Sequence, residues 1–306
     1  MELRSIASGS SGNCVYVRSG ATQILIDAGY SGRQIEKLLK MADIEPRKLS
    51  AILVTHEHSD HIAGVGVLSR RHHIPVYANA NTWRAMEHKL GKIKDHDHKE
   101  FTNGKPFLLG DMEVLPVPVH HDAADPVGYT FSSGREKISV VTDTGIVDRH
   151  LLDAMAGSDI YYFEANYEEF LLMHGDYSPW SKKRIASELG HLSNVQSAAA
   201  LCELLEGRGE QVLLAHMSIN NNTSACCQKT VCDYLEAQGF DTGRDVHVLV
   251  APRYEPSPLF SAEAIHAQRD RLAAFAGQRA RAEADVPNGL PNDLSYNELA
   301  NAGGRA

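Results

Sequence analysis

The chain has 306 residues, of which 43% are hydrophobic, so it is long enough to bury a substantial core as one large domain or two small ones. Its formal net charge of −9 excludes a protein that holds nucleic acid mainly through a diffuse basic surface. Sixteen histidines are many for this length, and with the acidic balance they favour a protein in which bound metal ions supply positive charge.

Cysteine usage and hydropathy indicate where the protein works. The five cysteines are odd in number and include no CxxC pair, which indicates reduced thiols. No secretory segment follows Met1, and the longest apolar stretches, such as residues 198–205, are far shorter than the ~20 residues of a membrane span. We therefore expect a cytoplasmic protein without a membrane segment.

Short runs rich in β-branched residues recur along the chain and predict strands over residues 15–17, 23–26, 51–54, 75–77, 113–119, 137–141 and 211–215. Apolar spacing predicts helices over residues 32–40, 61–71, 182–189, 194–206 and 223–237. The helix at 194 is the best marked, because Ser193 or Asn194 can cap it. Strands that are adjacent in places and separated by helices elsewhere indicate sheets covered by helices.

The composition changes after Phe260. Residues 262–285 are rich in Ala and Arg and predict a surface helix, and residues 286–306 have the Pro and Gly content of a disordered segment. We therefore divide the chain into a domain over residues 1–260 and a C-terminal helix and tail over residues 261–306. We assign the tail no chemistry and leave open whether it contacts a partner.

Four metal-binding side chains follow the predicted strand 51–54, where residues 55–61 read Thr-His-Glu-His-Ser-Asp-His. His56 and His58 are two positions apart on an extended chain and so point to the same side, while Asp60 and His61 fall on the turn into the next helix. Imidazole nitrogens with a carboxylate favour zinc, iron or manganese over calcium. A His-rich polar loop is the alternative, but such a cluster has no packing reason to follow a buried strand.

Donors also follow two later strands. The strand 113–119 leads into His121, and the strand 137–141 leads into Asp143 before a glycine turn. Either residue alone is more typical of a turn, but with the first cluster they complete a two-metal set in which one carboxylate bridges both ions. His191 at a helix start and His216 after the strand 211–215 are each a ligand or proton donor, or an ordinary capping or core histidine.

Other histidine pairs predict no metal site. His96 and His98 repeat the HxH spacing in a charged, turn-like segment with no strand before it, which predicts a solvated loop. His72 and His73 end a predicted helix after two arginines, which predicts a solvated or phosphate-facing patch.

The motif at residues 55–61 resembles the HxHxDH signature of the metallo-β-lactamase superfamily. The surrounding segments are similar to the YycJ/WalJ family of nucleases, in order, over residues 1–255. The similar segments are residues 8–13 (SGSSGN), 24–29 (ILIDAG), 121–129 (HDAADPVGY), 142–145 (TDTG), 190–194 (GHLSN) and 216–222 (HMSINNN).

The resemblance implies an α+β fold, the αββα sandwich with two mixed sheets face to face, helices outside and metals at one sheet edge. It implies a 5′-to-3′ exonuclease on double-stranded DNA with two divalent ions per chain, Zn²⁺ or Mn²⁺, with Fe²⁺ as an alternative. Two such ions would share a water and supply a bridging hydroxide for attack on phosphorus. One ion would be held by His56, His58 and His121, and the other by Asp60, His61 and His216, with Asp143 bridging.

The remaining roles also come from the resemblance. In related tRNA-processing ribonucleases the last ligand follows a late strand, which favours His216 over His191; His191 would then be a proton donor or phosphate contact. Asp60 could hold the proton of the nucleophile. Asp27 matches the motif that orients a ligand of the metal.

Substrate contacts are predicted at two places. The loop of residues 9–13 offers backbone N–H groups and the side chains of Ser10, Ser11 and Asn13 to a phosphate, or is simply a small-residue turn between strands. Candidate contacts to a nucleic-acid backbone are Arg70, Arg71, Lys182, Lys183 and Arg184.

Other functions stay open at this point. The same metal pair serves hydrolases of small thioesters, lactones or cyclic phosphodiesters, and RNA-processing nucleases. Lactam cleavage is disfavoured because Asp143 stands where lactamases have Cys, and an oxygen-reducing di-iron protein because such proteins have Glu where His58 stands. A metal-stabilised binding protein is disfavoured by the intact ligand set. The oligomeric state is left open.

Overall fold

The structure is a computed structural model that describes residues 1–271 and residue 274. One compact unit covers Met1–His266; in the second, Ala267–Ala306, residues 267–271 and 274 are helical. The domain boundary at residues 260/261 stays a prediction. The predicted disordered tail, residues 286–306, and most of the second half of the predicted helix 262–285 lie outside the described residues.

The first sheet is mixed and runs in the order β14-β1-β2-β3-β4-β5-β6 within the described residues. The strands β1 to β3 pair antiparallel and β3 to β6 pair parallel. Its strands are β1 (Glu2–Ala7), β2 (Cys14–Ser19), β3 (Thr22–Ile26), β4 (Ala51–Leu53), β5 (Val76–Asn79), β6 (His98–Phe101) and β14 (Phe260–Ser261).

The second sheet is also mixed and runs in the order β13-β12-β11-β10-β9-β8-β7 over the described part of the chain. The strands β7 to β10 pair antiparallel and β10 to β13 pair parallel. Its strands are β7 (Phe107–Leu109), β8 (Met112–Pro118), β9 (Val127–Ser133), β10 (Glu136–Val141), β11 (Ile160–Glu164), β12 (Glu210–Ala215) and β13 (Val246–Val250).

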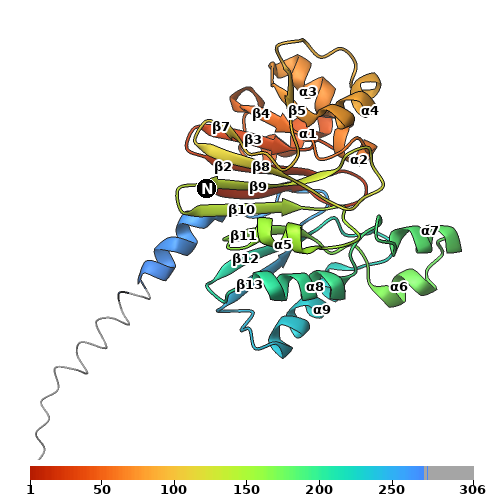
Figure 1. Cartoon of the computed structure of the whole chain (residues 1–306), viewed down its shortest axis with the longest axis vertical. Helices are drawn as coiled ribbons and strands as arrows, with labels where there is room; N and C mark the ends of the chain where they lie inside the picture. The colour runs from red at the N-terminus through yellow and green to blue at the C-terminus, as the bar shows by residue number, and fades with distance from the viewer. Residues whose placement is uncertain (272–273, 275–306) are drawn as a thin grey trace, which may run out of the picture. The chain divides into compact units, whose positions relative to one another are not determined.

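Helices cover both outer faces, with α1, α3 and α4 over the first sheet and α5, α8 and α9 over the second (Figure 1). Several begin at a side-chain cap; Ser193, for example, forms a reciprocal capping box with Gln196 at the start of α8. The helices are α1 (Gly32–Met41), α2 (Ser59–Ile62), α3 (Val65–His72), α4 (Ala80–Leu90), α5 (Arg149–Met155), α6 (Glu169–His174), α7 (Pro179–Ile185), α8 (Asn194–Leu204) and α9 (Ser224–Ala237), with the 3₁₀ turn η1 (Pro46–Lys48).

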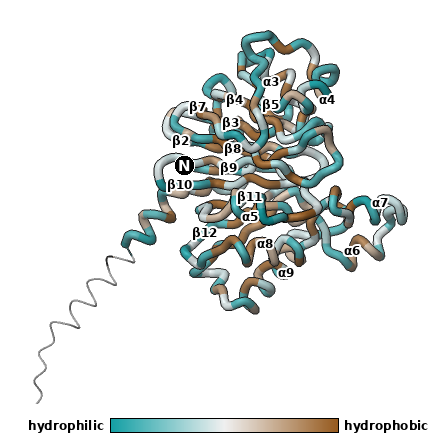
Figure 2. Tube along the Cα trace, in the orientation of Figure 1, coloured by the Kyte–Doolittle hydropathy of each residue, from teal (hydrophilic) through white to brown (hydrophobic). Residues whose placement is uncertain are grey.

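The core lies in three layers, one between the sheets and one under each set of helices. Alternate residues of both sheets, such as Val15 and Ile24 from the first and Phe131 and Ile138 from the second, fill the middle layer. Figure 2 shows the hydrophobic residues concentrated along the strands. This layering confirms the predicted αββα sandwich. No helix among the described residues has both the length and the apolar composition to cross a membrane.

Three local predictions were wrong. The helix predicted over residues 61–71 is two helices, α2 and α3. The break falls at Gly64, whose N–H donates to the carbonyl of Ala28 at 2.8 Å and where a Cβ would lie 2.5 Å from the carbonyl oxygen of Tyr30. The helix predicted over residues 182–189 starts earlier, because Ser178 caps it and Pro179 begins it.

The third concerns His98. It does not lie in a solvated loop but begins the strand β6, where its ring stacks on Trp83 with centroids 3.9 Å apart. His96 is exposed, as predicted.

The two sheets are joined next to residues 55–61. The Tyr129 hydroxyl, from β9, donates to the carbonyl of Val54 in the other half at 2.6 Å. The N–H of Val127 donates to the carbonyl of Thr55 at 3.1 Å. These bonds fix where the His-rich loop stands relative to the second sheet.

The Tyr129→Phe substitution should lower the free energy of unfolding by about 1–2 kcal/mol, because it keeps the ring but removes a buried hydrogen bond. Urea denaturation measures the change. Tyr77→Phe is the matched control, since the Tyr77 hydroxyl has no hydrogen bond to any described residue. Equal effects of the two substitutions would contradict a joining role for Tyr129.

Candidate metal centre

The predicted donors converge at one edge of the sandwich, because each follows a strand whose carboxyl end meets that edge. The first sheet contributes Asp27 after β3 and the loop after β4; the second contributes residues after β8, β10 and β12. The side chains brought together are Asp27, His56, His58, Asp60, His61, His121, Asp143 and His216.

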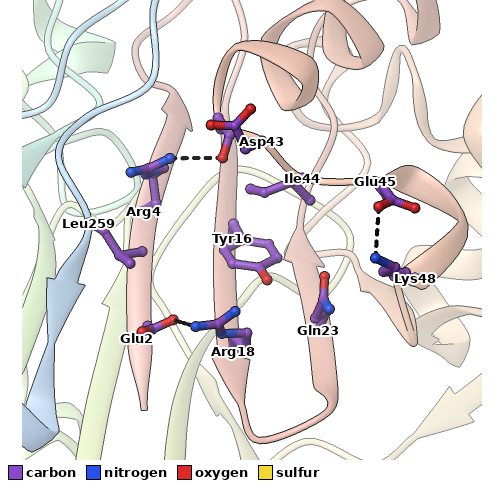
Figure 3. Close-up of a pocket in the computed structure, with 11 residues that line it drawn as sticks. Glu2, Arg4, Tyr16, Arg18, Gln23, Asp43, Ile44, Glu45, Lys48 and Leu259 are labelled. Carbon is purple, nitrogen blue, oxygen red and sulfur yellow. Dashed lines mark hydrogen bonds and ion pairs between the residues drawn. The ribbon is translucent and has the colours of Figure 1, made fainter.

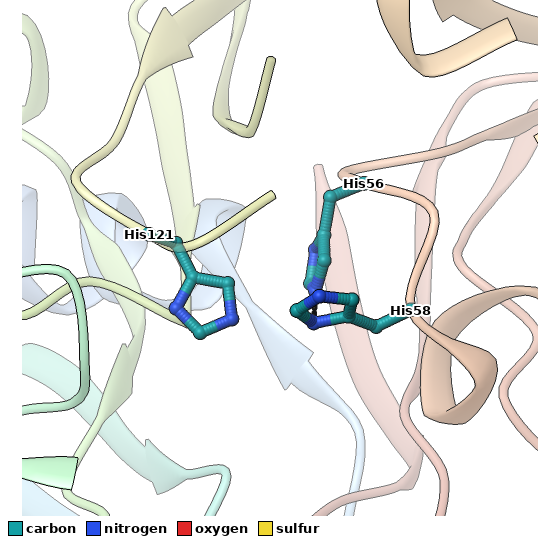
Figure 4. Close-up of side chains that lie close together, drawn as sticks. All are labelled: His56, His58 and His121. Carbon is teal, nitrogen blue, oxygen red and sulfur yellow. Dashed lines mark hydrogen bonds between the residues drawn. The ribbon is translucent and has the colours of Figure 1, made fainter. Parts of the chain in front are cut away.

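The first cluster consists of His56, His58 and His121, whose donor atoms lie within 4.8 Å of one another. Figure 4 shows His56 and His58 on one side and His121 facing them from the other. The His56 Nε2 and His58 Nδ1 atoms are 3.1 Å apart. His121 Nδ1 donates to the carbonyl of Gly190 at 3.1 Å, which leaves Nε2 for a cation.

The second cluster consists of Asp60, His61 and His216. One oxygen of Asp60, Oδ2, lies 3.6 Å from Nε2 of both histidines. Asp143 stands between the clusters: its Oδ2 is 3.4 Å from His61 Nε2, and its Oδ1 is 3.3 Å from His216 Nε2 and 3.7 Å from His121 Nε2. Asp143 is thus the one carboxylate placed to serve both clusters among the described residues.

The donor set fits two divalent cations. Asp143 Oδ2 and His216 Nε2 are buried without a hydrogen-bond partner, although buried polar atoms are nearly always paired. Asp143 Oδ2 faces Nε2 of His61, and His216 Nε2 faces Oδ1 of Asp143. Cations that accept these lone pairs would satisfy them, and nitrogen with carboxylate oxygen suits zinc, manganese or iron.

Asp27 fixes the ring of His61. It accepts hydrogen bonds from Thr55 N at 2.9 Å, Thr55 Oγ1 at 2.8 Å and His61 Nδ1 at 2.7 Å. Nε2 of His61 is therefore turned to the second cluster. Asp27 has a left-handed φ of 61°, as do Asp143 at 58° and His216 at 52°, so the chain accepts backbone strain where it aims these side chains.

The electrostatics of the site favour positive charge. Burial opposes ionisation of Asp143, but the imidazoles of His216 and His61 hold its pKa well below the usual range. Burial also opposes protonation of His61, yet Asp143 and Asp27 raise its pKa to about 9. Burial lowers the pKa of His56 well below its ordinary value, which keeps that ring neutral and able to act as a ligand.

Sequence comparison shows which known proteins the chain is similar to. The family model described as "Beta-lactamase superfamily domain" matches residues 22–217. The exodeoxyribonuclease YycJ of Bacillus anthracis is 41% identical over 239 residues, which cover 78% of this chain and 90% of that protein. The exodeoxyribonuclease WalJ of Streptococcus pneumoniae is 39% identical over 255 residues, which cover 83% and 93%.

The chain belongs to the YycJ/WalJ family of the metallo-β-lactamase superfamily. Solved structures show the same fold at low identity: the Bacillus subtilis protein YhfI has a TM-score of 0.64 at 15% identity, covering 85% of this chain and 98% of its own. Zn²⁺-bound PqqB from Methylobacterium extorquens has a TM-score of 0.64 at 16% identity, covering 84% and 100%. As a member of this superfamily, the protein is a metal-dependent hydrolase.

Glu164, a fully buried carboxylate at the end of β11, was not predicted as a functional residue. Its Oε1 accepts from His191 Nδ1 at 2.7 Å and from His216 Nδ1 at 3.1 Å, while its Oε2 accepts from Thr144 N at 3.0 Å. The carboxylate of Glu164 thus orients the rings of both His191 and His216. The signal was an acid at the end of an apolar run, as for Asp143, but the strand β11 had not been predicted.

The phosphate contact of residues 9–13 stays a prediction, and the side chains of this loop differ in exposure. Ser10 and Ser11 are exposed, and Ser11 Oγ hydrogen-bonds the hydroxyl of Tyr30 at 2.9 Å. Asn13 is buried instead: its Oδ1 accepts from Gly9 N at 2.9 Å, and its Nδ2 lies 3.1 Å from His61 Nε2. Asn13 therefore ties the loop to the second cluster.

Arg253 stands behind this loop and was also missed. Its guanidinium donates to the carbonyl of Met217, and its Nη1 is buried without a hydrogen-bond partner. A Cβ on Gly9 would overlap the guanidinium, so only glycine lets the two approach so closely. No sequence pattern marks Arg253, since its place follows from packing after β13.

A pocket away from the metal centre lies over β1, β2 and β3, beside the connection from α1 to η1 (Figure 3). Four of its charged side chains form two ion pairs, Arg18 with Glu2 at 2.5 Å and Lys48 with Glu45 at 2.7 Å, and Arg4 donates to the carbonyl of Ala42 at 2.9 Å. It contributes none of the predicted donors.

We predict that Glu164→Gln weakens metal binding about 10- to 100-fold. The glutamine side chain has the same size as glutamate, but its NH₂ group cannot accept a hydrogen bond. Either the imidazole N–H groups of His191 and His216 or the N–H of Thr144 would lose an acceptor, and a histidine ring that lost it would no longer be held in place. Competition with a chelating dye measures the affinity, and far-ultraviolet circular dichroism checks the fold.

Glu188→Gln, at an exposed position of the same part of the chain, is the control. Unchanged affinity in the Glu164→Gln variant would refute the orienting role.

Proposed function

We propose that this protein is a two-metal exonuclease that degrades double-stranded DNA from its 5′ end. The observation that carries the proposal is the pair of ligand clusters joined by Asp143. The similarity to two proteins named exodeoxyribonuclease, over nine tenths of their lengths, supports the substrate class. Five free cysteines are compatible with action in the reducing cytoplasm.

In this proposal His56, His58 and His121 would hold one ion, Asp60, His61 and His216 would hold the other, and Asp143 would serve both. When bound, the two divalent ions, Zn²⁺ or Mn²⁺ with Fe²⁺ as an alternative, supply hydroxide from a shared water and neutralise charge on the phosphate. The position of His216 beside Asp60 and His61 supports its role as the late ligand.

Asp60 and His191 take the proton-handling roles. Asp60 is partly exposed and reaches both histidines of its cluster through one oxygen, so its other oxygen can orient the nucleophile's proton. His191 is bonded through Nδ1 to Glu164, and its side chain is 12% exposed, more than that of His216. Its Nε2 is therefore the nitrogen left to protonate the departing oxygen of the substrate.

The test is digestion of a 5′-phosphorylated duplex labelled at one end, with added manganese or zinc. The protein should release nucleotides from the 5′ end, and the Asp60→Ala, His61→Ala double variant should lose at least about 10³-fold in rate, because it removes two donors of one cluster. Elemental analysis of both proteins measures the metal content.

The matched control is the Asp95→Ala, His96→Ala double variant, which also removes one carboxylate and one imidazole but at exposed positions. Its rate should equal that of the parent. The proposal is wrong if the parent leaves duplex DNA intact while hydrolysing RNA, a small thioester, a lactone or a cyclic phosphodiester.

A further inference from the structure

The segment of residues 168–190, which we call the arm, carries α6 and α7 and projects from the end of the sandwich where the strands reach the metal centre (Figure 1). It begins four residues after Glu164 and ends just before His191, and these two flanking residues are joined by a 2.7 Å hydrogen bond. Both ends of the arm are therefore fixed at the site.

The arm is also bonded to the loops that carry the metal donors. Arg184 donates to both carboxylate oxygens of Asp122, at 2.6 and 2.9 Å, and Asp122 N donates to the carbonyl of Leu189 at 3.2 Å. A Cβ on Gly145 would lie 2.3 Å from the carbonyl oxygen of Ser187, so the arm lies directly on the turn that follows Asp143.

Large hydrophobic side chains on the arm are exposed to solvent. Phe170 is 65% exposed, Met173 61% and Trp180 73%. The other tryptophan of the chain, Trp83, is only 3% exposed and stacks on His98. Single exposed hydrophobic residues are ordinary, but three on two short helices beside a metal centre indicate a contact surface.

The cations of the arm lie together on one helix. The helix α7 carries Lys182, Lys183 and Arg184 and no acid. The acids of the arm lie outside α7: Glu168 accepts from Asn194 and Glu169 from Ser193, while Asp176 and Glu188 are exposed before and after the helix.

Lys183 is exposed and has no hydrogen bond or ion pair with any described residue. Aromatic rings with cations beside them are the combination that holds single-stranded nucleic acid, whose bases stack and whose phosphates pair with lysine.

We propose that the arm holds the end of the nucleic-acid strand, with a terminal base stacked on Trp180 and a phosphate paired with Lys183. This inference rests on the proposed nuclease function and adds the element that grips the substrate. The sandwich supplies the cutting site, and the arm, tied to Asp122 and to the turn after Asp143, presents the strand end to it.

Trp180 is itself the reporter for the test. The metal-loaded protein is titrated with a 5′-phosphorylated duplex whose terminal linkages are phosphorothioates, which slow cleavage. Tryptophan emission should fall as bases stack on Trp180, while the Trp180→Ala variant, which retains only buried Trp83, should show no change. A duplex with abasic residues at its ends should bind without quenching the parent protein.

Kinetics give the second measurement. Trp180→Ala should raise KM for the unmodified duplex about tenfold with little change in kcat, as expected for one lost base stack, and Trp180→Tyr should restore most of the affinity. Lys183→Gln should make the slope of log affinity against log salt shallower by about one unit. The control is Leu108→Ala, which truncates an equally exposed side chain on β7.

Each outcome has one meaning. If the parent protein does not degrade DNA, the nuclease function fails first. If the parent degrades DNA but native and abasic ends quench equally, or Trp180→Ala leaves KM unchanged, the arm proposal alone is overturned. It is also overturned if sedimentation shows a dimer that Trp180→Ala dissociates while DNA binding is unaffected, because the arm is then a contact between two copies of the chain.

Discussion

Charge compensation at one buried edge is the constraint on which this structure depends. Asp27, Asp143 and Glu164 are all buried there, and an ionised carboxylate without partners in a protein interior costs more than a typical domain's whole stability. Burial opposes ionisation of all three, but the surrounding imidazoles hold the pKa of Asp143 and of Glu164 below the ordinary value. The pKa of Asp27 stays raised by burial, although Thr55 and His61 donate hydrogen bonds to it. The same arrangement leaves lone pairs on Asp143 and His216 facing inward, which is why the edge suits divalent cations.

Much of the site could be predicted because its signal is local. A run of apolar residues that forms a strand precedes each of His56, His58, His121, Asp143 and His216. The carboxyl ends of such strands gather at one edge of the fold. The αββα layering followed from the same runs together with the family resemblance. The exact ends of the helices did not, since caps such as Ser178 decide them.

What could not be predicted depends on contacts between distant residues. The role of Glu164 requires residues 191 and 216 to come near it, and Arg253 stands beside Gly9 although 244 residues separate them. The break between α2 and α3 likewise comes from Gly64 packing against the turn at residues 28–30. The exposure of the arm could not be predicted either, because it depends on how the whole chain folds and not on the local sequence Pro-Trp-Ser-Lys-Lys.

Each cluster combines residues from both sheets, and this division matters while the chain is still being synthesised. The residues His56, His58, Asp60 and His61 follow strands of the first sheet, which leaves the ribosome first. Each cluster also needs a histidine that follows a later strand of the second sheet, His121 or His216. Neither cluster is complete until the second sheet docks on the first. A nascent or partly unfolded chain therefore lacks a complete set of metal-binding side chains, and metal-dependent hydrolysis would begin only after folding has finished.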